Sequence, residues 1–383
     1  MSIPHQFDDI RPFESEELPM AFDRILANDQ FKQILAYLYP NTSLEAIAQR
    51  MRACKTSLEF QKTFAYNFLN NLLQKVAKSC DINIDTISNK HNYTFISNHR
   101  DIVLDSAFLC KLLMDSGFTT TCEIAIGDNL LSLPWVKDLV RINKSFIVER
   151  SLSMRQMLLS SKRLSEYMHY SIQEKKENIW IAQREGRAKD ANDRTAESIL
   201  KMMCMGGEGN ITERLIQLHL VPMTISYEYD PCDFLKAAEF QLKYDNPEWK
   251  KSAHDDVVSM QTGIMGYKGH IHYHCSACLD EYLQTIHPDT PKTEIFGIIA
   301  KHIDHEIHRN YRIYPNNYIA YDLLMNSNEH SNKYTADDKA SFERYVAQQV
   351  GKIDIPNKDE AYLSERILTM YANPLKNYWA ACK

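Results

Sequence analysis

Glycine is scarce in this chain, and long apolar runs are missing from it. Only 11 of the 383 residues are glycine, and the sequence contains no G-x-G-x-x-G, Walker or G-x-S-x-G motif. It therefore lacks the common short signatures of dinucleotide binding, nucleoside triphosphate binding and serine hydrolysis. No stretch approaches the ~18 uninterrupted apolar residues of a membrane span. The first residues have neither a basic region nor an apolar core, so we do not expect a targeting segment.

Neither sign of charge is in strong excess. The formal net charge is −6, with 44% hydrophobic and 25% charged residues, which is ordinary for a soluble globular protein. Bulk charge therefore gives no reason to expect a nucleic-acid partner. The nine cysteines are scattered, and their odd number and irregular spacing fit a reducing compartment better than a disulfide framework. We expect a cytoplasmic protein.

Helical periodicity dominates the N-terminal part of the chain. Apolar residues recur at helical spacing over 22–39, 43–54 and 57–77, so residues 1–85 are expected to form a helical N-terminal region that acts as a small domain or a cover. From residue 331 to 383 the pattern is again polar and helical, and we expect a C-terminal extension there. Between them, residues 86–330 form the expected central domain.

Within the central domain, short apolar runs alternate with helical patterns. This alternation predicts an α/β layered fold. The expected strands are 93–97, 123–126, 145–148, 178–182, 222–227 and 270–273, and the expected helices between them are 105–114, 154–175 and 195–205.

The stretch from Tyr93 to Cys110 holds the first chemical candidate. An apolar run ending at Ser97 is followed by polar residues, and then by a helical pattern for which Asp101 is a plausible cap. His99 would thus lie in a strand-to-helix turn, where a neutral imidazole can act as a general base. Asp105 is the candidate to orient it. The alternative is a hydrogen-bonded turn histidine beside a surface carboxylate, which is the commoner situation for an isolated pair.

Two arginines follow expected strands, and a basic segment surrounds the first of them. Arg150 and Arg187 can each grip an anionic oxygen through two N–H groups. The window 131–163 holds seven basic and two acidic residues, a local charge of +5. This is either a solvated basic face or a site for a phosphorylated substrate or an anionic membrane surface. The residues alone leave both interpretations open.

Histidines and cysteines near the end of the central domain raise the question of a metal. His270, His272 and His274 alternate on an expected strand, and Cys275 and Cys278 have the spacing of zinc ligands. No second Cys-x-x-Cys accompanies them, so we expect an ordinary strand and loop without metal. A second set recurs every third residue and is expected to be a polar helix face: His302, His305 and His308.

Four blocks in the central domain resemble the lysophospholipid and glycerol-3-phosphate acyltransferase superfamily. In chain order they are N98-H-R-D-I-V-L-D105, N143-K-S-F-I-V-E-R150, I181-A-Q-R-E-G-R-A-K-D190 and L220-V-P-M-T-I-S-Y-E-Y229. They match the family's His-x-x-x-x-Asp block, its Phe-Ile/Val-x-Arg strand, its Glu-Gly-x-Arg block and its Val-Pro-Val-x-Ile strand. The resemblance covers about residues 90–275. It implies an α/β fold with a mixed sheet flanked by helices.

Three departures from the family pattern concern the sites. Five residues separate His99 from Asp105, where the family has four. Three interpretations are open: the turn absorbs the extra residue, Asp101 orients His99 in place of Asp105, or the histidine–aspartate pair does not form. The third block lacks a residue between Gly186 and Arg187. Position 143 is Asn, where the family often has Gly.

The resemblance implies transfer of an acyl chain from a thioester, on coenzyme A or acyl carrier protein, to a hydroxyl of glycerol-3-phosphate or a lysophospholipid. His99 would remove the hydroxyl proton, with Asp105 holding the imidazole. No metal or other cofactor is implied, and the protein would work at the inner face of an anionic membrane. The residues expected to bind substrate are Arg100, Lys144, Phe146, Arg150, Glu185, Gly186, Arg187 and Lys189.

Two other functions remain open at this level. The same blocks would serve acylation of an amino or hydroxyl group on an aminolipid without phosphate, with less need for both arginines. A non-catalytic lipid- or carrier-binding protein is the second alternative, and it gains if His99 and Asp105 do not meet in the fold. Acyl length, donor, acceptor position and oligomeric state are not specified by the sequence.

Overall fold

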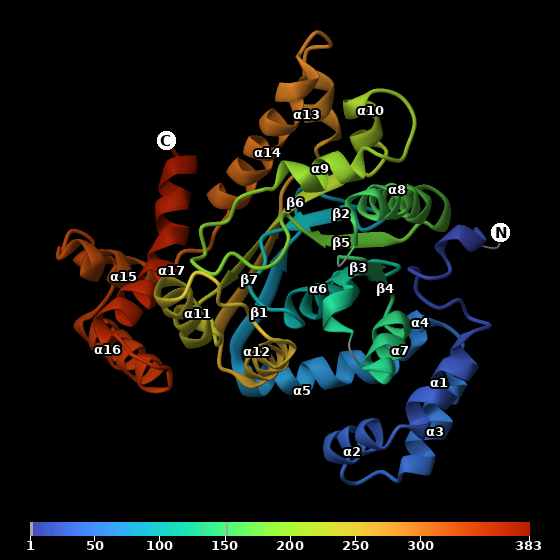
Figure 1. Cartoon of the computed structure of the whole chain (residues 1–383), viewed down its shortest axis with the longest axis horizontal. Helices are drawn as coiled ribbons and strands as arrows, with labels where there is room; N and C mark the ends of the chain where they lie inside the picture. Colours follow the sequence, from blue (N-terminus) through green and yellow to red (C-terminus); the bar gives the residue numbers. More distant parts are fainter. Residues whose placement is uncertain (1–2, 132, 151) are drawn as a thin grey trace.

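A single mixed sheet forms the centre of the molecule. The computed structural model describes residues 3–131, 133–150 and 152–383 (Figure 1). Seven strands lie in the order β1-β7-β6-β2-β5-β3-β4. Their bounds are β1 Ala77–Asn83, β2 Thr94–Ser97, β3 Cys122–Gly127, β4 Ser145–Val148, β5 Asn178–Ala182, β6 Leu220–Tyr227 and β7 Gly269–Cys275.

Strand direction divides the sheet into two parts. β2 is parallel to both its neighbours, with Phe95 opposite Trp180 of β5 and Val221 of β6. β3 and β4 continue this parallel part. β7 is antiparallel to β6 and parallel to β1, which makes the sheet mixed. Because β2, β3, β4, β5 and β6 run the same way, their carboxyl ends lie along one edge of the sheet.

Helices cover both faces of the sheet, which is why the central strands are buried along their whole length. Every residue of β2 and β6 is buried. One face packs against α8 (Met154–Tyr170), α9 (Glu197–Met203), α10 (Ile211–Ile216) and α14 (Lys292–Arg309). The other packs against α5 (Tyr66–Val76) and α6 (Leu104–Asp115). The expected mixed α/β sheet flanked by helices is confirmed.

The N-terminal region is helical, with one difference in its boundaries. The expected helix 22–39 is two helices, α1 (Leu18–Ala27) and α2 (Asp29–Leu38), because Asn28 is extended and its side chain caps α2 at Phe31 N. α3 (Leu44–Ala53) and α4 (Ser57–Phe60) follow, and a π-helical turn, Gln61–Ala65, joins α4 to α5. Figure 1 shows α1, α2 and α3 projecting below the sheet. Residues 1 and 2 of this expected region lie outside the described residues.

The expectation of a helical region up to residue 85 is wrong for residues 77–83. They form β1, which pairs with β7 at the edge of the sheet. Its residues are mostly half-buried, so the strand lacks the clear alternation by which sequence reasoning recognises one. Pairing with β7, whose paired residues lie 191 or 192 positions further along the chain, decides the conformation of this segment.

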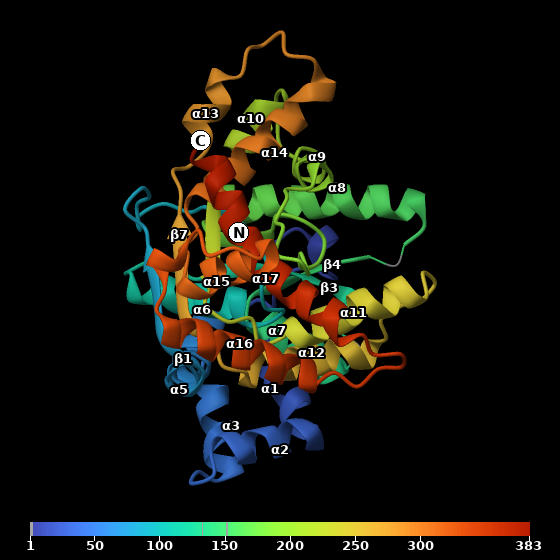
Figure 2. The same ribbon diagram turned by 90° about the vertical axis from the view of Figure 1, so that its left-hand side faces the viewer.

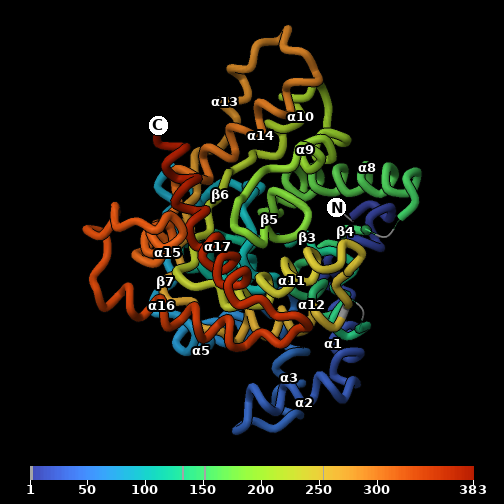
Figure 3. Tube along the Cα trace, turned by 60° about the vertical axis from the view of Figure 1, so that its left-hand side comes forward, coloured from blue at the N-terminus to red at the C-terminus, as the bar shows by residue number. Residues whose placement is uncertain are grey.

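The C-terminal helices form a separate cluster around α11. α15 (Pro315–Met325), α16 (Ala336–Gly351) and α17 (Glu360–Ala381) share an apolar core with α11 (Asp233–Asp245). Figure 3 shows α17 running beside α11 and α15. The remaining α-helices are α7 (Pro134–Ile142), α12 (Ala253–Met265) and α13 (Asp280–Thr285). Among the described residues, no helix combines the length and apolar character needed to cross a bilayer.

Candidate active site

His99 and Asp105 meet in the structure. His99 follows β2 at the carboxyl edge of the sheet, and its Nδ1 atom lies 2.7 Å from Oδ2 of the fully buried Asp105 on α6. The same oxygen accepts the backbone N–H groups of Arg100 (2.6 Å) and Asp101 (3.0 Å). A carboxylate that only accepts hydrogen bonds fixes the proton on Nδ1, so Nε2 is the basic ring nitrogen. The longer His-to-Asp spacing is therefore absorbed in the turn.

Asp101 has a different task. Its Oδ1 accepts the N–H groups of Val103 and Leu104 at 2.9 and 2.8 Å, which caps the first turn of α6. Burial, and then the charge of Asp105, raise the pKa of Asp101. The structure thus assigns orientation of His99 to Asp105 and helix capping to Asp101.

Neighbouring strands fix the turn that carries His99. The Asn98 side chain donates to Ile225 O and accepts from Ile225 N, at 2.9 and 2.8 Å, and so ties the end of β2 to β6. Trp180 of β5 packs edge-on against the imidazole, with ring centroids 5.4 Å apart. These contacts hold the ring in one place before any substrate arrives.

A cavity of about 1100 Å³ opens beside His99. This slightly exceeds the ~300–1,000 Å³ typical of small-molecule sites. One part is walled by apolar side chains from the N-terminal helices, α6 and α7, among them Phe31, Leu35, Phe64, Phe68, Ala107, Met114, Trp135 and Leu139. A long hydrocarbon chain fits such surroundings, since each buried CH₂ contributes about 0.8 kcal/mol.

The other part of the cavity is rich in cations. Its lining includes Arg150, Arg184, Arg187, Lys189, Lys243 and Lys251, against the carboxylates of Glu185, Asp190 and Asp256. The cavity therefore combines one apolar arm, one cationic arm and an imidazole. Such a combination suits an amphipathic molecule with an anionic head.

Arg187 and Lys189 differ in how they are held. The buried Nη1 of Arg187 has no hydrogen-bond partner within the part of the chain that the structure describes. A cationic N–H group left unpaired beside a cavity favours an anionic ligand. Lys189 contacts Glu239 of α11. Burial, then the nearby cations Lys243, Lys251 and Arg187, lower the pKa of Lys189 to about 8.

Of the ten sequence-predicted site residues, seven lie at the cavity: His99, Arg150, Glu185, Gly186, Arg187 and Lys189 line it, and Asp105 stands directly behind His99. The other three do not reach it. Arg100 makes a buried bidentate pair with Asp193, at 2.6 and 3.2 Å. Lys144 lies at the opposite end of β4 from Arg150 and binds Glu177 at 2.6 Å. Phe146 points to the other face of the sheet, against Tyr167 of α8.

The structure also separates the histidines considered as metal ligands. His270 bonds to Ser79 and His272 to Asp81, while Cys275 is buried in the core. His302 stacks on Tyr282, and Nε2 of His308 donates a hydrogen bond to the Asp193 carbonyl oxygen. Neither set converges on a point.

Sequence reasoning missed several cavity residues. Arg184 stands in the third block, immediately before Glu185, and its position after β5 was a usable signal. The apolar residues of α2 gave no such signal, because a helix that lines a cavity and one that fills a core have the same periodicity.

An imidazole held by a carboxylate thus lies at a cavity lined by apolar and cationic residues, and a family comparison covers the strands that carry this site. Residues 78–226 match the family model described as Acyltransferase. This segment therefore matches the acyltransferase family, which confirms the family resemblance of the sequence blocks. No curated protein matches the chain.

One solved structure similar to this chain is the 1-acyl-sn-glycerophosphate (LPA) acyltransferase PlsC from Thermotoga maritima. The alignment covers 75% of this chain and 93% of that one, at 10% sequence identity and a TM-score of 0.36. A likeness this distant supports no conclusion about substrate.

Proposed function

We propose that this protein transfers a fatty acyl chain from a thioester donor, acyl-CoA or acyl-carrier protein, to a hydroxyl group of glycerol-3-phosphate or a lysophospholipid. The observation that carries the proposal is the His99–Asp105 pair, 2.7 Å apart, at a cavity with one apolar and one cationic arm. The apolar arm fits the acyl chain, and the cationic arm fits the phosphate of the acceptor. The acyltransferase family match supports the type of reaction.

The chemistry follows from the tautomer that Asp105 imposes. Nε2 of His99 takes the proton of the acceptor hydroxyl while that oxygen attacks the thioester carbonyl carbon. Asp105 stabilises the imidazolium that forms. The tetrahedral intermediate then expels the thiolate, which recovers the proton from His99. An ester C–O bond replaces the C–S bond in a direct transfer without an acyl-enzyme.

Arg150 and Arg187 are the proposed phosphate ligands, and Arg184 joins them because it lines the same arm. A charge-assisted bidentate contact contributes about 1.5–3 kcal/mol. Glu185 and Gly186 shape this part of the cavity. Arg100, Lys144 and Phe146 have no part in the proposal, since their side chains are engaged elsewhere.

We further propose that the protein works in the cytoplasm, attached peripherally to the inner face of an anionic membrane. Much of the +5 segment is paired: Lys144 with Glu177, Arg163 with Glu149, and Lys162 with Glu166. The stronger support is the start of α8, where Met154, Leu158 and Leu159 are 88%, 62% and 61% exposed. Figure 2 shows this end of α8 reaching beyond the sheet. Exposed apolar groups beside Arg155 suit an anionic bilayer surface.

The test is acyl transfer by the purified protein across a panel of acceptors with both donor types, read by lipid mass spectrometry. The panel includes glycerol-3-phosphate, lysophospholipids and an aminolipid without phosphate. We expect product only with phosphate-bearing acceptors, and a loss of ~10²–10⁴-fold in His99→Ala, the usual cost of removing a general base. The control is His287→Ala, in an exposed link. Activity of His99→Ala near the wild-type level would contradict the mechanism, and transfer to the aminolipid alone would favour that alternative acceptor.

A further inference from the structure

A second group of reactive side chains lies away from the cavity. His219 directly precedes β6, while Cys278 and Asp280 lie in the connection from β7 to α13 and at the start of α13. Because β6 is parallel to β2, His219 stands at the amino edge of the parallel strands, opposite the edge that carries His99. The acyl-transfer proposal uses none of these three residues.

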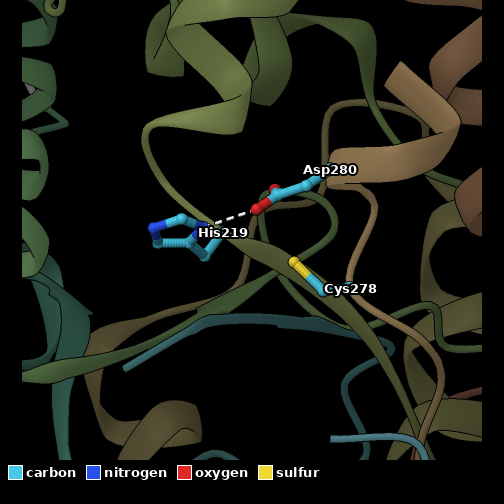
Figure 4. Close-up of side chains that lie close together, drawn as sticks. All are labelled: His219, Cys278 and Asp280. Carbon is cyan, nitrogen blue, oxygen red and sulfur yellow. Dashed lines mark hydrogen bonds and ion pairs between the residues drawn. The ribbon is translucent and has the colours of Figure 1, made fainter. Parts of the chain in front are cut away.

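The three side chains converge on one point (Figure 4). Their ligand atoms, an imidazole nitrogen, a thiol sulfur and a carboxylate oxygen, all lie within 4.8 Å of one another. His219 Nδ1 and Asp280 Oδ2 are 2.6 Å apart. In a tetrahedral zinc site with bonds of about 2.0–2.3 Å, ligand atoms stand roughly 3.3–3.8 Å apart. Side-chain adjustments of about 1 Å or less bring this trio into that range.

The backbone holds these residues together independently of their side chains. Leu279 N donates to Leu220 O at 2.8 Å, so the segment carrying Cys278 and Asp280 is bonded directly to the strand that follows His219. The His219 carbonyl accepts Thr94 N at 3.1 Å. Because the backbone already fixes the ligand positions, less conformational entropy is lost when an ion binds.

The trio also has unused bonding capacity. The second carboxylate oxygen of Asp280, Oδ1, is buried and has no hydrogen-bond partner among the described residues. Cys278 is one of nine free cysteines and forms no disulfide. A buried carboxylate oxygen without a partner costs free energy unless an ion or water satisfies it.

We propose that His219, Cys278 and Asp280 bind a divalent transition-metal ion of the zinc class. Sulfur, imidazole nitrogen and one carboxylate oxygen suit zinc or cobalt, whereas magnesium and calcium require mainly oxygen ligands. His219 is half exposed, so solvent completes the coordination. The ion would join the start of β6 to α13, and would contribute to stability rather than to acyl transfer.

Metal binding by the full-length protein tests the site. After treatment with a chelator and its removal, the protein is titrated with zinc and, separately, with cobalt(II). We expect about one equivalent of tightly held zinc by elemental analysis, and a thiolate-to-cobalt charge-transfer band. Magnesium in excess should not displace either ion.

Matched variants identify the ligands. Cys278→Ser and Asp280→Asn preserve side-chain size, and each should weaken zinc binding by at least about tenfold, because even second-shell changes have this effect. Cys278→Ser should also abolish the charge-transfer band. Cys382→Ser and His287→Ala, both exposed and outside the trio, should bind zinc like the wild type. Zinc should raise the unfolding temperature of the wild type and the controls but not of Cys278→Ser.

Two outcomes overturn the proposal. One is the absence of retained zinc in the wild type; the other is equal zinc binding by the wild type and by both Cys278→Ser and Asp280→Asn. Because acyl transfer is not measured, failure here leaves the proposed function untouched. Should Cys278→Ser not fold, Asp280→Asn decides the question.

Discussion

Arg150 lies directly against the backbone of Gly127, the last residue of β3. A Cβ atom at position 127 would stand 2.6 Å from Arg150 Nε. The φ angle of Gly127 is −70°, which any residue adopts, so glycine is needed here for space and not for conformation. The same Cβ would stand 2.5 Å from Asn129 Oδ1, so the missing side chain leaves room for Asn129 and for the Arg150 guanidinium, and both residues line the cavity.

Gly127→Ala is therefore expected to reproduce the loss of Arg150. The methyl group displaces the guanidinium, and kcat/KM for a phosphate-bearing acceptor falls by ~10–100-fold, as it should in Arg150→Ala, since each 1.4 kcal/mol is tenfold. Steady-state kinetics with varied acceptor measure this. Gly351→Ala is the control, because a Cβ there meets no atom within 4 Å. Wild-type acceptor kinetics in both Gly127→Ala and Arg150→Ala would remove Arg150 from the phosphate site.

Asp105→Asn and Asp101→Asn should separate orientation from capping. Asp105→Asn deprives His99 Nδ1–H of its carboxylate and favours the wrong tautomer, so acyl transfer should fall by orders of magnitude. Asp101→Asn keeps a side chain that can cap α6, so activity should stay near the wild-type level. Both are measured as kcat at saturating substrates. The reverse result would assign the orienting role to Asp101.

Arg100→Ala and Arg187→Ala should fail in different ways. Arg100 neutralises the buried Asp193, and its removal should lower the free energy of unfolding by about 3–5 kcal/mol. Arg187→Ala should leave stability nearly unchanged but lower kcat/KM for the phosphate-bearing acceptor by ~10–100-fold. Denaturant unfolding and acceptor kinetics on both variants distinguish the roles. Normal stability of Arg100→Ala combined with defective acceptor use would return Arg100 to the substrate site.

Acceptor binding should weaken above pH 8. Burial and neighbouring cations lower the pKa of Lys189 to about 8, so its charge is lost as the pH rises through that value and not near 10.4. KM for an anionic acceptor should then rise between pH 7 and 9. Lys189→Arg keeps its charge across this range, and its KM profile should be flatter. Identical profiles for the two proteins would show that Lys189 does not contribute to acceptor binding.

Vesicle sedimentation tests the start of α8. The wild type should bind vesicles that contain anionic lipid, and Leu158→Glu/Leu159→Glu should bind at least about tenfold more weakly, since two apolar contacts are replaced by charges that the surface repels. High salt should reduce wild-type binding by screening Arg155. Met325→Glu, at an exposed methionine of α15, is the control. Equal binding by the double variant and the wild type would exclude this helix end as the membrane contact.

Local patterns in the sequence were enough to locate the turn that carries His99, the candidate general base. An apolar strand, four polar residues and an apolar helix occur in immediate succession around His99, and short-range chain geometry places such a histidine at the strand end. The same reasoning placed Arg150 and Arg187 after strands, because parallel strands bring their carboxyl ends to one edge. These inferences hold because each depends on neighbours within about ten residues along the chain.

The same sequence patterns could not predict the direction in which each side chain points. In β4 the sequence predicts that successive side chains lie on opposite faces of the sheet. Which of the two faces meets the cavity depends on where α8 and the N-terminal helices pack. Ser145 lines the cavity, and Phe146, one residue on, lies in the opposite core. The direction of the Arg100 side chain was equally ambiguous from the sequence, since its partner Asp193 is far along the chain.

The sequence by itself thus determined the type of fold, the order of the four blocks and the residues able to perform proton transfer. Tertiary structure alone decided that Asp105 rather than Asp101 meets His99, that α2 walls the apolar arm, and that Cys278 joins His219 and Asp280 instead of the histidines of β7. The physical reason is that local propensity depends on a few consecutive residues, whereas a site is made where segments distant in sequence pack together.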